Sequence, residues 1–267
     1  MPLKRRAVTA ARTSMYWRKI GMSHYTSTLQ PAVTAPAAET ARPRGISATL
    51  AWTCALMVLA SLQGIANESW RAWSGQSAKL LSLNLEIMAQ LALYAVVVTL
   101  LVVLVRLTHE PVRVCLGFDR LRARDVLLGF GCALASWIIV SVLASTPIID
   151  HFSPSSTTTV EQVFSILSLW TLATVAGPVA EELLFRGFLH HGLRRQLGAI
   201  ATLLVTSIMF ALIHRGYGYG WDHVILAFVY GLMLGGLRWY SGGTTASLAA
   251  HVMVNGIPIT AGLILAL

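Results

Sequence analysis

Four polar side chains in the last third of the chain have types and spacing that could support chemistry: Glu181, His214, His251 and Asn255. They interrupt apolar sequence long enough to cross a bilayer, where ionisable groups are costly and mark functional sites by default. A carboxylate in such a place could take a proton from water while a histidine assists or positions that water. His251 with Asn255 could then donate hydrogen bonds to a developing oxyanion. This set of residues is therefore suited to hydrolysis by activated water.

A second acid and a base follow Glu181 closely in the sequence. Successive helical residues are about 100° apart, so Glu181 and Glu182 cannot both point the same way, whereas Glu182 and Arg186 at i and i+4 can pair. We expect Glu182 and Arg186 to form a supporting pair and Glu181 to face a cavity as the base. Pro178 suits the first turn of a helix, so a helix that restarts after Gly177 would place its positive end near Glu181.

The positions of Glu181 and His214 predict a helical hairpin. Their midpoint falls beside Gly198, and glycine is a natural helix stop. Two antiparallel helices that turn there would carry both side chains to equal depth, each roughly 25 Å of helix from the turn. His251 and Asn255, one turn apart, share a helix face and could close the site from another side.

The same cluster could instead hold a metal ion. Carboxylate and imidazole groups are ligands of a divalent metal such as zinc, and here the ligands would be Glu181, His214 and His251. The sequence supports both a metal-free glutamate mechanism and a metal-dependent one, so the cofactor stays unknown. Glu182 and Arg186 could also have a purely structural role, as an ion pair that only stabilises the fold.

Other functions have less support in the sequence. No HExxH or GxSxG motif occurs, and Asp222 has no intramembrane aspartate partner. A proton-coupled membrane carrier is the main alternative, because it would also bury Glu and His, although no inverted repeat is apparent. The histidines at the ends of apolar runs are expected to be interfacial, namely His109, His190, His191 and His223.

The composition is that of a polytopic membrane protein. Of 267 residues, 55% are hydrophobic and only 12% are charged, and the mean hydropathy is +0.66. Charged residues make up about 25% of an average soluble chain, so an ordinary soluble enzyme and a disordered chain are both excluded. The three cysteines have no CxxC spacing and predict neither a disulfide framework nor a cysteine metal site.

Apolar runs predict an all-α, polytopic transmembrane helical bundle. A bilayer core takes about 20 apolar helical residues, and about seven stretches qualify, of which the fourth is interrupted by Gly177, Pro178 and charged residues. The expected spans are 46–66, 80–105, 126–145, 162–191, 199–214, 222–237 and 244–267.

The basic residues predict the orientation of this bundle. Lys and Arg collect in cytoplasmic loops, and a cytoplasmic N-terminus puts seventeen of the 20 on the inside. The net charge of +9 is therefore a topology signal first, with attraction to anionic lipids as an addition. No stacking motif or folded basic domain supports a nucleic-acid partner.

The chain divides into three expected parts. Residues 1–45 hold eight basic residues against one acid and have no apolar core, which predicts a disordered cytoplasmic tail rather than a secretory signal. A transit peptide has a similar composition, so whether this tail belongs to the mature protein is left open. Residues 46–145 would form the N-terminal transmembrane helices, and residues 146–267 the core that carries the polar cluster.

At these residues the sequence resembles the CPBP family, the CAAX protease and bacteriocin-processing family of type II CAAX prenyl endopeptidase-like membrane proteins. The resemblance covers roughly residues 165–257 and rests on several motifs together. They are EExxxR at Glu181, Glu182 and Arg186, FxxxH at Phe210 and His214, Phe228 with Gly231 and Gly235, and HxxxN at His251 and Asn255.

The resemblance implies an α-helical intramembrane endopeptidase, a hydrolase, that opens towards the cytosol. Glu181 would be the water-activating base and His214 its catalytic partner, while His251 and Asn255 would stabilise the oxyanion or bind metal. Glu182 with Arg186 would be the supporting pair.

The implied partners are a protein or peptide substrate at the membrane and the lipid bilayer itself, in an integral, multi-pass protein of a bacterial cytoplasmic membrane. CAAX prenyl protease-like processing of a membrane-associated or lipidated protein is the nearest analogy. Bacteriocin maturation, self-immunity and membrane-protein turnover are the alternatives.

Overall fold

The structure, a computed structural model, describes residues 45–74, 79–118, 121–143, 160–216 and 219–266. Nearly all of the expected tail and the expected boundary between residues 145 and 146 lie outside these ranges. Every regular element in the described ranges is helical, which confirms the all-α fold class. In chain order the elements are α2 (Ile46–Ser74), α3 (Lys79–Arg106), α4 (Val112–Leu116), α5 (Ala123–Leu143), α6 (Val160–Thr171), η3 (Leu172–Ala176), α7 (Gly177–Glu182), η4 (Leu183–Leu189), α8 (His190–Gly216), α9 (Trp221–Ser241) and α10 (Thr244–Ala266).

Three helical stretches among the described residues are long and apolar enough to cross a membrane. They are Leu85–Arg106, Val163–Gly216 and Trp221–Ser241, and a shorter apolar helix covers Ile46–Leu62. The long stretch of 54 residues contains the expected fourth and fifth spans in one continuous run. The described residues thus include helices with the length and composition of membrane spans. The count of seven spans stays a prediction.

The surface of the helical unit is rich in exposed apolar side chains, and charged side chains are buried beside its apolar core. Leu127 and Ile200 are 70% and 68% exposed, whereas Glu182 and Arg186 are 0% and 1% exposed. Apolar side chains on the outside suit contact with lipid, where every polar group must find its partner inside the protein.

The segment that carries Glu181 is one unbroken helix that changes register twice. The π-helical turns η3 and η4 flank α7, and the backbone stays right-handed helical through Ala176, Gly177 and Leu183. Pro178 lies in the first turn of α7, as expected. The helix does not restart after Gly177, however, so no free, positive helix end lies beside Glu181. The wider π turn accommodates the proline ring, which would clash with the carbonyl four residues earlier in a regular α-helix.

The predicted turn at Gly198 is present. Within α8 this residue alone has a non-helical backbone, with φ 76° and ψ −174°. A positive φ is easily adopted only by glycine, so the chain reverses here and separates α8 into two arms. The first arm continues from η4, and the second carries Phe210 and His214.

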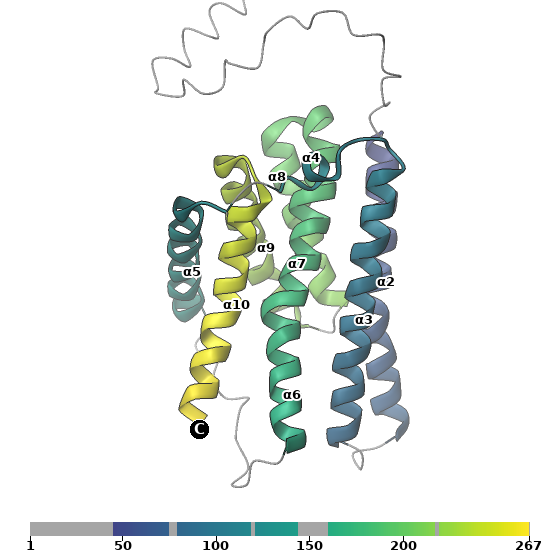
Figure 1. The fold of residues 1–267 in the computed structure, drawn as a ribbon, viewed down its shortest axis with the longest axis vertical. Helices are drawn as coiled ribbons and strands as arrows, with labels where there is room; N and C mark the ends of the chain where they lie inside the picture. Colours follow the sequence, from purple (N-terminus) through teal and green to yellow (C-terminus); the bar gives the residue numbers. More distant parts are fainter. Residues whose placement is uncertain (1–44, 75–78, 119–120, 144–159, 217–218, 267) are drawn as a thin grey trace, which may run out of the picture. The chain divides into compact units, whose positions relative to one another are not determined.

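Small residues bring the helices of the core together. α8 packs most extensively on α9, and α10 packs on α5, as Figure 1 also shows. A Cβ atom on Gly231 of α9 would lie 3.1 Å from the Cα atom of Ser207 on α8. A Cβ atom on Gly235 would meet the side chain of Leu203. The GxxxG of α9 therefore allows close approach to α8, which fixes the distance between two walls of the polar cluster.

Candidate functional site

The site is built around the buried carboxylate of Glu182. Arg186 Nη1 lies 3.1 Å from Glu182 Oε1, so the ion pair expected from the i, i+4 spacing is present. The same oxygen accepts a hydrogen bond of 3.0 Å from Nδ1 of His251 on α10. Because a buried carboxylate needs compensating charge and donors, this oxygen ties α7, η4 and α10 together.

Arg186 makes further contacts that fix its position. Its Nη2 donates to the carbonyl of Gly231 on α9 at 3.2 Å, and its guanidinium lies 4.2 Å above the ring centroid of Phe210. Its own carbonyl accepts a hydrogen bond of 3.1 Å from Nε of Arg238. The paired guanidinium thus connects the site to α8 and α9.

The imidazole of His251 lies between the two neighbouring glutamates. Its Nδ1 contacts Glu182, while its Nε2 lies 3.7 Å from Glu181 Oε2, which is longer than a direct hydrogen bond. The Glu181 side chain is 9% exposed and that of Glu182 is fully buried. The two acids therefore differ as the helix geometry predicts, with Glu182 in the ion pair and Glu181 turned elsewhere.

His214 contacts both the backbone and the aromatic ring of Phe210, the residue four positions before it. Its Nδ1 lies 2.8 Å from the Phe210 carbonyl. A carbonyl can only accept, so Nδ1 carries the proton and Nε2 keeps its lone pair. The Phe210 ring centroid lies 4.9 Å from that of His214 and 5.8 Å from that of His251. Both imidazoles thus pack on one aromatic ring.

Asn255 has a structural contact that follows from the π turn. Its Nδ2 donates to the carbonyl of Ala173 at 3.0 Å. In a π-helical turn that carbonyl would accept from the residue five positions later, which is Pro178 and has no N–H. The side chain of Asn255 therefore satisfies a carbonyl that the proline leaves without its helical donor, and it holds α10 against η3.

Two aromatic residues near the site were not among the predicted site residues as such. The sequence marks Phe210 only as part of the FxxxH motif, yet Arg186, His214 and His251 all pack on its ring. Tyr230 of α9 lies 5.4 Å from His251 between ring centroids. Its hydroxyl is buried without a hydrogen-bond partner among the described residues. A tyrosine in an apolar helix gives no sequence signal for such a position.

The three residues that the sequence offered as metal ligands are not assembled as a metal site. Among the described residues, Glu181, His214 and His251 do not form a group whose ligand atoms all lie within 4.8 Å of one another. A metal bound by all three would therefore require side chains to move.

Comparison with known proteins identifies the part of the chain that holds this cluster. Residues 163–257 match the family described as type II CAAX prenyl endopeptidase Rce1-like. The match includes the two glutamates, Arg186, both histidines and Asn255. No curated protein and no solved structure matches the chain.

The matched segment confirms the resemblance that the motifs indicated. Residues 163–257 carry an Rce1-like domain of the CAAX protease family, and the helices around it are apolar enough to cross a membrane. The matched domain indicates a membrane protease, a hydrolase, and such a family implies a protein or peptide substrate at the membrane.

Proposed function

We propose, from the membership of residues 163–257 in the Rce1-like family, that this chain is an intramembrane endopeptidase in which Glu181 activates the attacking water. The substrate would be a membrane-associated or lipidated protein, with CAAX prenyl protease-like processing as the nearest analogy. The observation that carries the proposal is the imidazole of His251, whose nitrogens lie 3.0 Å from Glu182 and 3.7 Å from Glu181.

In this mechanism Glu181 acts first as a general base and then as a general acid. Its carboxylate accepts a proton from water as the water oxygen attacks the carbonyl carbon of the peptide bond. Negative charge moves onto the carbonyl oxygen, where donors stabilise it. The carbon–nitrogen bond breaks when the proton passes from Glu181 to the leaving nitrogen. The products are one new carboxyl group and one new amine, and Glu181 is again a carboxylate.

The surrounding residues orient this reaction. Glu182 accepts a hydrogen bond from the Nδ1–H of His251, and the other ring nitrogen then faces Glu181. His214 carries its proton on Nδ1, so its Nε2 can accept a hydrogen bond from the water. An amide nitrogen has two hydrogens, so Asn255 can hold Ala173 with one and offer the other to the oxyanion.

The experiment compares protein termini in membranes from cells that express the wild-type chain or Glu181→Gln at matched levels. We expect termini that the wild type generates to fall by about a hundredfold or more in the variant, because a positioned general base contributes about that much. Glu86→Gln on α3 makes the same chemical change in another helix and is the matched control. His214→Ala should likewise lose cleavage while still inserting into membranes.

Termini that persist at wild-type levels in correctly inserted Glu181→Gln would remove Glu181 as the base. Termini that are identical in wild type and empty cells would remove the protease assignment for this chain.

A further inference from the structure

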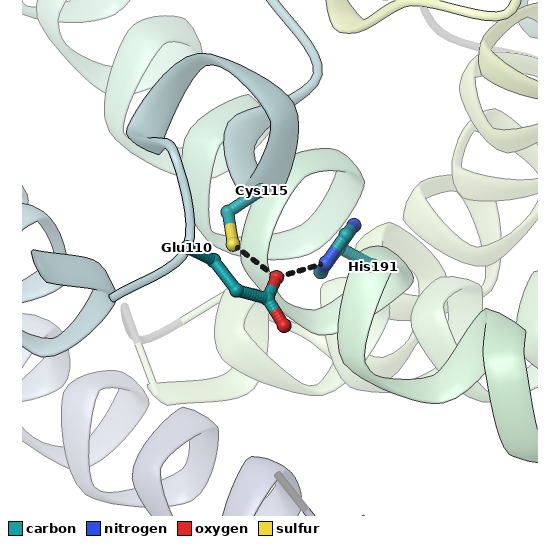
Figure 2. Close-up of side chains that lie close together, drawn as sticks. All are labelled: Glu110, Cys115 and His191. Carbon is teal, nitrogen blue, oxygen red and sulfur yellow. Dashed lines mark hydrogen bonds and ion pairs between the residues drawn. The ribbon is translucent and has the colours of Figure 1, made fainter. Parts of the chain in front are cut away.

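A second cluster of polar side chains lies outside the catalytic group, where α4 meets the start of α8. Glu110 follows α3, Cys115 belongs to α4 and His191 lies at the start of α8, and Figure 2 shows the three side chains converging. Glu110 Oε2 lies 3.0 Å from Cys115 Sγ and 2.7 Å from His191 Nε2. One carboxylate oxygen thus joins a thiol and an imidazole that are far apart in the sequence.

The distances are close to those of a metal site. One ligand atom from each residue lies within 4.8 Å of the other two. Tetrahedral zinc, with bonds of about 2.0 to 2.3 Å, holds its ligand atoms roughly 3.4 to 3.6 Å apart. The carboxylate oxygen is closer than that to both partners, so a shift of about half an ångström would make room for the ion between them.

The charges also suit a divalent cation. A thiolate and a carboxylate would neutralise two positive charges, and a neutral imidazole adds none. Arg195 Nη1 lies 3.3 Å from Oε1 of Glu110, so the guanidinium occupies the other carboxylate oxygen and leaves Oε2 for the ion.

The ligand types select the metal. A thiolate with an imidazole and one carboxylate favours zinc, whereas magnesium and calcium prefer oxygen ligands alone. We propose that Glu110, Cys115 and His191 bind one Zn²⁺ per chain, with the thiol proton of Cys115 released on binding. Sequence analysis did not predict this site, because the spacing of its three ligands matches neither a CxxC nor an HExxH motif.

Bound zinc would fasten α4 to the helix that carries the catalytic residues. Cys115 is fully buried, and the carbonyl of the next residue, Leu116, accepts a hydrogen bond of 2.7 Å from Thr244 at the start of α10. Gly187 of η4 packs so closely that a Cβ atom there would lie 3.1 Å from Leu116 Cα. The ion would therefore add a further fixed point to α4, which already contacts η4 and α10.

The test uses the full-length chain in detergent, stripped of metal and then titrated with Co²⁺ and Zn²⁺. Wild type should bind one ion per chain and show the sulfur-to-cobalt charge-transfer absorption of a thiolate ligand. Cys115→Ser should lose that absorption, and Glu110→Gln and His191→Gln should each weaken zinc binding by about a hundredfold or more. Zinc should also raise the melting temperature of wild type and leave that of Cys115→Ser unchanged.

Two variants are matched controls: Cys132→Ser changes a cysteine of α5, and His190→Gln changes the histidine next to the proposed ligand. Both should keep stoichiometric binding. Failure of the folded wild type to bind one ion, or equal binding by Cys115→Ser and Cys132→Ser, would overturn the proposal. Because none of these readouts measures peptide cleavage, the zinc site and the protease mechanism can fail separately.

Discussion

At the scale of single residues, the catalytic cluster depends on a buried charge that several groups share. Glu182 is fully buried, and its carboxylate is compensated by Arg186 and by the Nδ1 proton of His251. Spacing alone predicted the first contact, because i, i+4 residues always share a helix face. It could not predict the second contact, since His251 is 69 residues away and reaches Glu182 only through the packing of α10.

Arg186→Met should destabilise the protein by about 3–5 kcal/mol, because it leaves a buried carboxylate without its cation. Adding Glu182→Gln should recover a large part of that loss, since no buried charge then remains unpaired. Unfolding of the four members of this double-mutant cycle in detergent measures the effect. Arg195→Met removes a largely exposed guanidinium from a pair and should cost no more than about 1 kcal/mol. If the losses of stability caused by Arg186→Met and Glu182→Gln simply add in the double variant, the two side chains do not form a coupled buried ion pair.

At the scale of elements, the helix that carries Glu181 shows where sequence reasoning succeeded and where it stopped. The turn at Gly198 followed from the position of a glycine midway between two polar residues. The π-helical turns could not be predicted in this way, because they depend on Pro178 together with a hydrogen-bond donor from another helix, Asn255. The cluster of Glu110, Cys115 and His191 was missed for the same reason, since the fold alone brings its members together.

Asn255→Leu should cost about 1–3 kcal/mol of stability, because it leaves the partly buried Ala173 carbonyl without a donor. Pro178→Ala restores a backbone N–H that can reach this carbonyl, so the cost of Asn255→Leu should shrink in the Pro178→Ala background. Thermal unfolding of the wild type, both single variants and the double variant tests this coupling. An equal cost of Asn255→Leu in both backgrounds would show that the proline does not create the need for Asn255.

The contact between α8 and α9 allows a matched test of helix packing. Gly231→Ala places a methyl group 3.1 Å from the Ser207 backbone and should destabilise the protein by about 1–3 kcal/mol, because overpacking separates the helices. It should also reduce cleavage, since the Gly231 carbonyl holds Arg186. Gly236→Ala on the same helix meets nothing within 4 Å and should stabilise the helix by about 0.5–1 kcal/mol. Equal effects of the two alanines on unfolding would exclude close packing at Gly231.

At the scale of the whole molecule, the structure and the sequence describe the same membrane protein by different signals. Exposed apolar side chains and a buried polar cluster follow from the fold, while orientation follows from the distribution of basic residues. Three stretches meet the length and apolarity of a span within the described residues, and one of them contains the hairpin that turns at Gly198. A span count therefore depends on treating this 54-residue stretch as two crossings, which the reversal at Gly198 supports.

The predicted topology can be tested with two exposed positions on opposite sides of the membrane. Seven spans with a cytoplasmic N-terminus put Leu121 inside and Trp221 outside, and these side chains are 60% and 63% exposed. In a background without the natural cysteines, an impermeant maleimide added to intact cells should label Trp221→Cys and spare Leu121→Cys. Permeabilised cells should label both. The predicted topology separates these two positions by an odd number of crossings, so they lie on opposite sides of the membrane. Labelling of both variants, or of neither, in intact cells would put them on the same side and would contradict the topology.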